Sequence, residues 1–227
     1  MKTRAFAFGF ALVLAGASAP ADTAKTPNLD PGVVTRPGPV SRLVLAQELF
    51  FQGLAAKDPL ALIQSARMMQ QVGIIKAAER VPAASGKTLK TDSPAPVPFP
   101  IAKATLATAE YLAKGDDTLL GLIDAVRAEA AVPRGAVRRS TSAIAPGGTD
   151  TWTLAFFGES TAELAVLGNG LSTLSIIVAD ENGPSVCTTT GAEDRLYCRF
   201  TPLENGEFTV TVTNSGKAVE AYQLITN

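Results

Sequence analysis

The last third of the sequence alternates large apolar residues with small polar ones, and this alternation constrains the fold more than any other feature. Near the C-terminus, Phe208, Val210 and Val212 alternate with threonines. Because successive side chains of an extended strand point to opposite faces, these apolar residues would share one face of a sheet. Segments 151–157 and 162–167 show the same pattern. The sequence therefore predicts antiparallel strands with one buried face.

Turn-forming residues separate these segments at short distances. The turn clusters lie at residues 158–160, 168–170 and 180–184. Glycine and asparagine tolerate the positive φ angles of tight turns, and proline fixes its own φ angle. Apolar runs at 174–179 and 218–225 add two further strands, and two more would carry the cysteines. The pattern predicts a compact antiparallel β domain over residues 137–227.

The two cysteines predict a structural disulfide. Cys187 and Cys198 lie on either side of the turn-forming residues 191–194. In an oxidising compartment, two cysteines on adjacent hairpin strands are expected to pair. Closing a loop of this length stabilises a fold by roughly 2–3 kcal/mol. The wide spacing differs from the C-x-x-C pattern of redox-active pairs, which disfavours a redox function.

The N-terminus has the pattern of a secretory signal peptide. Two basic residues precede an apolar run over residues 5–15, and small residues follow. The run is shorter than the about 20 apolar residues that span a bilayer. Two A-x-A sites compete for cleavage. Because cleavage after Ala19 would leave a proline as the first mature residue, we expect cleavage after Ala21, which makes residues 1–21 the signal peptide.

The expected mature chain is soluble and lies in the periplasm or outside the cell. No later segment is long and apolar enough to cross a membrane, and neither cysteine lies near the signal to carry a lipid. Cleavage removes Lys2 and Arg4 and no acidic residue, so the net charge changes from −1 to −3. Nucleic acid is therefore not an expected partner, because phosphate binding needs a concentrated basic surface.

Histidine is absent from the whole sequence. Without an imidazole, nucleophilic systems of the Ser-His-Asp and Cys-His types are excluded, and so are histidine-ligated zinc and copper sites. A pair of carboxylates or a Ser-Lys dyad remains open as catalytic chemistry. We expect no cofactor, and the composition favours a protein that is not an enzyme.

The N-terminal half predicts helices after an extended start. Residues 22–40 are rich in proline and glycine and predict a tether. Ser41 is the predicted cap of the first helix, and Asp58 with Pro59 predicts the start of the second, which Gly73 would end. The apolar positions of the first helix are Leu43, Ala46, Phe50 and Leu54. Their spacing of three and four residues predicts an antiparallel helical hairpin.

A proline-rich connector, residues 85–100, separates this hairpin from a second one. Asp117 or Thr118 is the predicted cap of the last helix. Asp116 and Asp117 also suit a general acid and base, but their place between two helices favours capping. The apolar positions of that helix are Leu119, Leu122, Ile123, Val126 and Ala130. Two hairpins over residues 41–132 predict a small bundle, and the fold class is α+β in two parts, helical hairpins followed by the β domain.

Three arginines follow Pro133 at the passage into the β domain: Arg134, Arg138 and Arg139. A basic cluster suits an anionic lipid or an acidic partner. Three arginines steer a partner only weakly, so a solvated linker between the two parts is the favoured interpretation.

Short motifs recur along the β domain. They are Trp152-x-Leu154-x-Phe156, residues 165–170, residues 177–183, residues 198–202, residues 206–214 and Ala221-Tyr222-x-Leu224. In these motifs the domain resembles the bacterial pre-peptidase C-terminal domain. The resemblance implies a β-sandwich or jelly roll without catalysis of its own, usually appended to secreted proteins. It covers residues 137–227 and not the helical part. Members often carry aspartates in the third strand, where this chain has Leu174-Ser175-Ile176, so no calcium site is implied.

Two features of the β domain have both a functional and a structural interpretation. Asp180, Glu181 and Asn182 offer oxygen ligands, but calcium takes six to eight of them, and a plain turn is favoured. Trp152 suits stacking on a sugar, whereas its period-two alignment with Leu154 favours a place in the core.

Two pairs of large apolar residues lie on the first two predicted helices. They are Phe50 with Phe51 and Met68 with Met69. A small bundle has little room to bury both members of each pair, so they predict a candidate groove for a peptide, a lipid or another envelope protein. Ordinary core packing is the alternative. If the groove binds a partner, a polar substitution of Phe51 or Met68 should abolish that binding.

These features predict an exported, non-enzymatic protein, a binding or accessory module of the envelope or the extracellular space whose ligand the sequence does not identify. The alternative is a hydrolase or lyase of a cell-envelope polymer that uses two carboxylates, with the β domain as an accessory. A calcium-dependent surface module is a further alternative.

Overall fold

The computed structural model describes residues 26–32, 37–76, 82–85, 100–129, 133, 135–168, 171–191 and 195–227. The predicted signal peptide with its cleavage site, Arg134 and most of the connector 85–100 lie outside the described residues. The helices are α1 (Pro39–Ala56), α2 (Pro59–Gln70), α3 (Ala102–Leu112) and α4 (Asp117–Ala128). The strands are β1 (Gly73–Lys76), β2 (Ala83–Ser85), β3 (Ala136–Ile144), β4 (Thr149–Phe156), β5 (Ala162–Gly168), β6 (Leu174–Asp180), β7 (Ser185–Gly191), β8 (Arg195–Phe200), β9 (Gly206–Asn214) and β10 (Glu220–Thr226).

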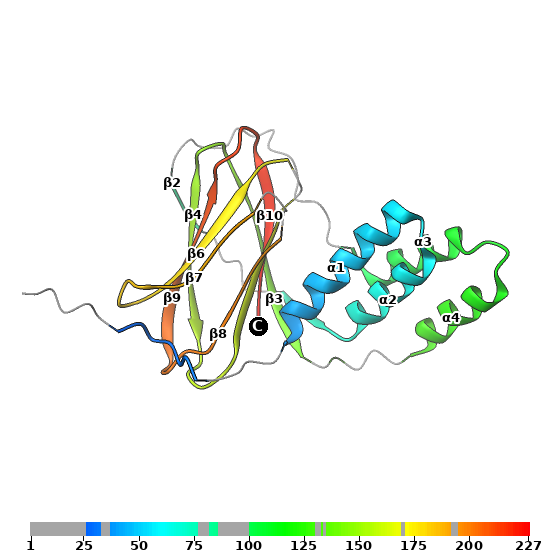
Figure 1. The fold of residues 1–227 in the computed structure, drawn as a ribbon, viewed down its shortest axis with the longest axis horizontal. Helices are drawn as coiled ribbons and strands as arrows, with labels where there is room; N and C mark the ends of the chain where they lie inside the picture. Colours follow the sequence, from blue (N-terminus) through cyan, green and yellow to red (C-terminus); the bar gives the residue numbers. More distant parts are fainter. Residues whose placement is uncertain are drawn as a thin grey trace, which may run out of the picture.

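The strands form two five-stranded sheets that face each other as a sandwich (Figure 1). Sheet A has the order β1-β3-β10-β5-β8, and sheet B has the order β2-β4-β9-β6-β7. The side chains between the sheets form the sandwich core, which includes Trp152, Ile176, Phe208 and Leu224. The predicted fold class is confirmed, since four helices precede a C-terminal β-sandwich.

The alternation of residue types places the strands as predicted. In β9, Phe208, Val210 and Val212 are buried, whereas the threonines between them are half-buried on the other face. One expectation about pairing is wrong. The cysteine strands do not form a hairpin in one sheet, because β7 pairs with β6 in sheet B and β8 pairs with β5 in sheet A.

Two short strands lie where the sequence predicted helix or connector. β1 pairs in parallel with β3 at the edge of sheet A, and β2 pairs antiparallel with β4 at the edge of sheet B. Gly73, the predicted helix stop, is the first residue of β1, since α2 already ends at Gln70. Arg138 and Arg139 lie within β3, between β1 and β10, and not in a solvated linker. Strands this short depend on their partners, so the local sequence gives little sign of them.

The helix starts agree with the sequence at one cap and differ at two. Asp58 accepts hydrogen bonds from the backbone N–H groups of Leu60 and Ala61 at 2.9 and 3.2 Å, which confirms the predicted start of α2. α1 begins at Pro39, before Ser41, because proline suits the first helical position. The cap of α4 is Asp116, whose carboxylate accepts from the Leu119 N–H at 3.0 Å.

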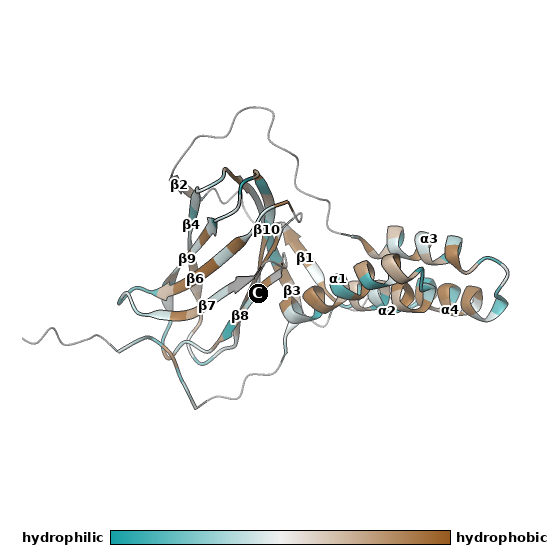
Figure 2. Cartoon of the chain, turned by 45° about the horizontal axis from the view of Figure 1, so that its top comes forward, coloured by the Kyte–Doolittle hydropathy of each residue, from teal (hydrophilic) through white to brown (hydrophobic). Residues whose placement is uncertain are grey.

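The helices bury two separate apolar clusters. The outer cluster joins α2, α3 and α4 through Leu62, Ile63, Ala66, Leu106, Ala109, Ala113, Ile123 and Val126. The inner cluster joins α1 to the outer face of sheet A through Val40, Leu43, Ala46, Val137, Ala165, Leu167 and Ile225, with Met69 and Val72. Figure 2 shows all four helices on one side of the sandwich. Leu122, predicted to line the buried face of α4, is instead 42 % exposed.

A buried carboxylate fixes the start of α1 to sheet A. Glu163 of β5 is fully buried and accepts from the backbone N–H groups of Gly38 at 2.8 Å and Val40 at 3.1 Å. The Tyr197 hydroxyl donates to the same carboxylate at 2.6 Å. A negative charge is favourable at a helix N-terminus, where unpaired N–H groups gather. A Cβ on Gly38 would lie 2.3 Å from a Glu163 oxygen, so the contact requires glycine there.

Candidate functional site

A cavity of about 360 Å³ opens at the end of the sandwich where β4 leads into β5. We call it the sandwich-end cavity. Its lining comes from β3, β4, the connection after β4, β5 and the end of the chain: Arg138, Leu154, Ala155, Phe156, Phe157, Ser160, Thr161, Ala162, Thr226 and Asn227. Ligand pockets span about 300–1,000 Å³, so the volume suits a small molecule or a short segment of a polymer.

The floor of the sandwich-end cavity is the end of the sandwich core. Leu154, Phe156 and Ala162 belong to that core and are buried. Phe156 is held by edge-to-face contacts with Phe200 and Phe208, with ring centroids 5.5 and 5.7 Å apart. Aromatic pairs in this arrangement stabilise each other beyond their burial alone. The floor is therefore apolar and is part of the packed core.

Arg138 reaches the cavity because of its place in β3. Val137 packs in the inner cluster beneath α1, and Ile144 packs in the sandwich core. Since side chains alternate along a strand, Arg138 lies on the core side of sheet A, in the same row as Ser142 and Ile144. It is exposed, and within the described residues its guanidinium makes no hydrogen bond or ion pair. Arg138 thus supplies an unpaired positive charge at the end of an apolar space.

Phe157 stands at the rim of the cavity on an anchored loop. Its side chain is 76 % exposed. The next residue, Gly158, donates its N–H to the Asn205 side chain at 2.8 Å, and the Glu159 N–H donates to the Pro202 carbonyl at 2.8 Å. A Cβ on Gly158 would come within 2.7 Å of the Glu204 backbone, so this close approach requires glycine. These contacts fix the backbone of the loop, and Phe157 remains exposed at the rim.

Hydroxyl groups complete the lining. Those of Ser160, Thr161 and Thr226 make no hydrogen bond to any residue that the structure describes. The Asn227 amide is already engaged, because it donates to the Thr161 carbonyl at 2.7 Å and accepts from the Glu163 N–H at 2.9 Å. Hydroxyls both donate and accept, so these three suit a ligand with hydroxyls of its own. The lining residues include no carboxylate side chain.

A second polar network lies inside the sandwich, where Trp152, Tyr222 and Asp150 are buried. Trp152 donates to the Tyr222 hydroxyl at 2.7 Å, Tyr222 donates to Asp150 at 2.7 Å, and Ser142 donates to the same Asp150 oxygen at 2.7 Å. Burial and the Asp150 charge raise the pKa of Tyr222 far above its ordinary value. Trp152 is buried, which confirms its predicted place in the core. The network satisfies buried polar groups and stabilises the core.

The acidic turn that suited calcium is used for structure. Asp180 accepts from the Asn182 N–H at 2.9 Å, as in an Asx turn, and from the Asn28 N–H of the N-terminal segment. Among the described residues, no group of three or more acidic or cysteine side chains is placed to hold a metal ion. Asp116 caps α4, as expected of an acidic residue between two helices.

The four residues of the candidate groove lie in different environments. Met69 is buried in the inner cluster, and Phe50 and Met68 are half-buried against it. Phe51 is 41 % exposed, and its ring meets that of Phe50 edge-to-face at 5.4 Å. Phe51 is thus the one of the four that faces solvent most, and binding of a partner there remains a prediction. None of the described helices combines the length and apolar character needed to span a bilayer.

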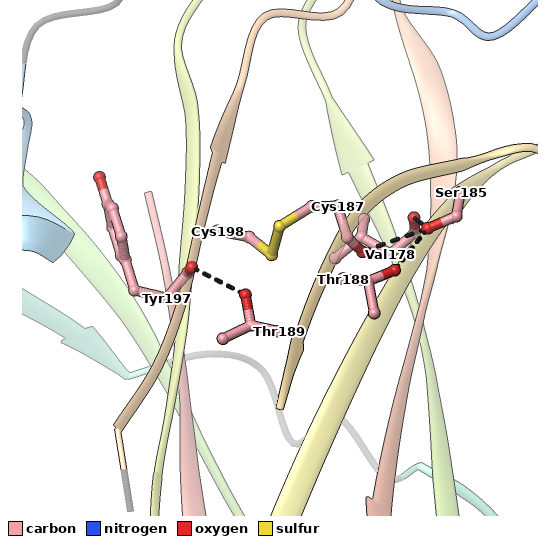
Figure 3. The surroundings of a disulfide bond; sticks show 7 residues. All are labelled: Val178, Ser185, Cys187, Thr188, Thr189, Tyr197 and Cys198. Atoms are coloured by element: carbon pink, nitrogen blue, oxygen red, sulfur yellow. Dashed lines mark hydrogen bonds between the residues drawn. A yellow bond between two sulfur atoms is a disulfide. The ribbon is translucent and has the colours of Figure 1, made fainter. Parts of the chain in front are cut away.

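The predicted disulfide is present and joins the two sheets. Cys187 on β7 and Cys198 on β8 are bonded, with their Cα atoms 6.1 Å apart (Figure 3). Close to the disulfide, the Thr189 hydroxyl donates to the Tyr197 carbonyl at 3.5 Å. Because β7 and β8 are the last strands of their sheets, the disulfide closes one edge of the sandwich.

The sequence did not single out Arg138 as a cavity residue, and it missed Phe157. The signal for Arg138 was its position next to the apolar Val137 at the start of a strand, where adjacent side chains face opposite sides. The neighbouring arginines obscured this signal. The signal for Phe157 was its position directly after Phe156. In a strand one of two adjacent phenylalanines must point away from the core.

Comparison with known proteins yields structural likeness only. No protein-family model matches the sequence, and no curated protein matches it. The pre-peptidase C-terminal domain of a collagenase from Bacillus anthracis is 13 % identical, covers 38 % of this chain and 86 % of its own, and has a TM-score of 0.35. PliG of Aeromonas hydrophila, a periplasmic inhibitor of g-type lysozyme, is 13 % identical, with coverage of 40 % and 84 % and a TM-score of 0.30.

A family 35 carbohydrate binding module from Clostridium thermocellum is 17 % identical, with coverage of 36 % and 71 % and a TM-score of 0.25. At such identities a likeness concerns the fold alone. The helical part of the chain is not matched.

Proposed function

We propose that this chain is an exported, non-enzymatic binding module that takes its ligand in the sandwich-end cavity. The observation that carries the proposal is the lining itself. A guanidinium and three hydroxyls without a hydrogen-bond partner among the described residues, together with an exposed ring, surround an apolar floor. A concave apolar site with a few convergent polar groups is the usual form of a ligand pocket.

The chemistry of the lining favours binding over catalysis. A hydrolase or lyase of the kind considered from the sequence needs two acidic side chains in one cleft. The residues that line the cavity include none, and the sequence has no histidine to serve as a base. The buried carboxylates of Glu163 and Asp150 lie outside the lining and already accept hydrogen bonds from backbone amides or hydroxyls.

Export is supported by the predicted signal peptide and by the disulfide between Cys187 and Cys198. Disulfides form and persist in oxidising compartments such as the periplasm and the extracellular space. The ligand would accordingly be a component of the envelope or of the medium.

A binding screen tests the proposal. The protein, purified after export, is titrated by calorimetry with neutral oligosaccharides, acidic oligosaccharides and short peptides. We expect at least one class to bind, and Phe157→Ala or Arg138→Met to weaken that binding about tenfold or more. Tyr111→Ala on α3 and Arg199→Met on β8 are the matched controls, since both residues are exposed and lie outside the lining. Binding that neither cavity variant weakens, or turnover of the ligand, would contradict the proposal.

A further inference from the structure

Resting on this proposed function, we infer that the ligand of the sandwich-end cavity is a carboxylated sugar unit of a polysaccharide. The inference comes from matching each free group of the lining to one feature of the ligand. Arg138 faces the carboxylate, Phe157 faces the apolar side of the sugar ring, and the three hydroxyls face the sugar hydroxyls.

The charge of the ligand follows from Arg138. Within the described residues its guanidinium has no acidic partner, and no carboxylate side chain belongs to the lining. A guanidinium presents a planar fork of N–H donors that matches the two oxygens of a carboxylate. The floor beside it, formed by Leu154, Phe156 and Ala162, is apolar and offers no competing charge.

The sugar character follows from the other polar groups. Ser160, Thr161 and Thr226 offer hydroxyls, which donate and accept hydrogen bonds equally well. Sugar hydroxyls have the same double capacity, whereas a peptide backbone presents separate donors and acceptors. The exposed ring of Phe157 at the rim provides a flat apolar surface for the C–H face of a sugar.

The size of the site points to recognition of a short stretch. A volume of about 360 Å³ lies near the lower end of ligand pockets. The rim is open at Phe157, so a polymer could enter with one unit in the cavity and continue outside. Recognition of the charged unit then decides which polymer binds.

The test uses three probes on the exported protein: a galacturonate oligosaccharide, the same oligosaccharide with its carboxylates reduced to alcohols, and a short peptide with a free C-terminal carboxylate. We expect the acidic oligosaccharide to bind about tenfold or more tightly than the reduced one, because a hydrogen bond to a charged group is lost. Salt at about 1 M should weaken the binding of the acidic oligosaccharide and leave the binding of the reduced oligosaccharide unchanged.

Variants test whether Arg138 causes the preference for the acidic oligosaccharide. Arg138→Met should abolish the difference between the acidic and reduced oligosaccharides, and Arg138→Lys should restore part of it, since lysine keeps the charge and loses the fork. Arg199→Met should leave the difference intact. Melting temperatures of the variants verify that each one folds.

The outcomes separate the two proposals. If both oligosaccharides bind equally and Phe157→Ala weakens them, the inferred carboxylate is wrong and the binding module stands. If only the peptide binds and the cavity variants weaken it, the inferred sugar is wrong and the module again stands. If none of these probes and no compound of the wider screen binds at the cavity, both proposals are wrong.

Discussion

The helix nearest the sandwich and the helix farthest from it are held in different ways. α1 buries Val40, Leu43 and Ala46 against sheet A, and its first N–H groups bind the Glu163 carboxylate. α4 buries Ile123 and Val126 in the outer cluster with α2 and α3, and its ion pairs lie at the surface. The inner helix α1 therefore packs directly on the sandwich, whereas the outer helix α4 is held by its contacts with other helices.

We therefore expect α1 and the sandwich to resist local opening and α4 to open more readily. Buried charge-assisted hydrogen bonds and apolar contacts with a sheet resist local opening, whereas exposed ion pairs stabilise little. The sandwich also has two connections that the helices lack, a disulfide between its sheets and a buried network around Tyr222. Four changes test this comparison, from the largest expected loss of stability to the smallest.

Removing the Glu163 carboxylate should remove the hydrogen bonds that attach the start of α1 to the sandwich. Glu163→Ala leaves the N–H groups of Gly38 and Val40 and the Tyr197 hydroxyl without their buried acceptor. We expect the free energy of unfolding to fall by about 3–5 kcal/mol in urea titrations. Glu207→Ala on the exposed face of β9 is the control. An equal loss in the free energy of unfolding in both variants would show that the hydrogen bonds to Glu163 do not stabilise the fold.

Removing the disulfide should weaken the sandwich and spare the outer helices. For the double variant Cys187→Ala and Cys198→Ala we expect a loss of about 2–3 kcal/mol in the free energy of unfolding. Reduced wild-type protein should show the same loss. Hydrogen exchange should rise at β7 and β8 and remain unchanged in α4. A rise in α4 instead would mean that the two regions open together.

Raising the pH above about 10 should destabilise the sandwich through Tyr222. Burial and the charge of Asp150 raise the pKa of Tyr222 in the folded state. The contribution of Tyr222 to the free energy of unfolding is therefore complete below pH about 10, and it is lost above that pH because the tyrosine of the unfolded chain deprotonates there. We expect a loss of about 1.4 kcal/mol at pH 11 from this residue.

Urea titrations of wild type and Tyr222→Phe at pH about 8 and about 11 measure the effect. The variant should be less stable at both values, but its stability should fall less between them. Tyr111→Phe, at an exposed position of α3, should fall as much as wild type. Identical pH dependence in wild type and Tyr222→Phe would contradict the prediction.

Removing the surface ion pair between α2 and the end of α4 should have the smallest effect. Arg67 binds Glu129 at 2.7 Å, but the two side chains are 49 % and 41 % exposed. For Arg67→Ala we expect a loss below about 1 kcal/mol and faster amide exchange confined to α4. Arg199→Ala serves as the control. Unchanged exchange in α4 would show that the apolar contacts alone hold that helix.

The sequence predicted the parts of the fold whose signals are local. The alternation of Phe208, Val210 and Val212 with threonines located β9, and Asp58 with Pro59 located the start of α2. The pairing of Cys187 with Cys198 was also predicted, although the strands that carry them belong to different sheets. Such signals survive because strand alternation and helix capping depend on neighbouring residues.

The candidate site was much less predictable. The sequence places Arg138 in a linker cluster and Phe157 at the end of a strand. The cavity arises where residues from β3, β4, β5 and β10 meet, so no segment of the chain carries a signal for it. β1 and β2 were missed for the same reason, since each consists of a few residues held by one distant partner.

The periodicities, the start of α2 at Asp58, the cysteine pair and the absence of histidine follow from the sequence alone, because each of these is a property of residue types and their spacing. Tertiary packing was needed to bring Glu163 to the first N–H groups of α1, to join the two sheets through the cysteines, and to place Arg138 and Phe157 around one cavity. These outcomes depend on which strands become neighbours, and that choice is made by packing between segments far apart in the chain.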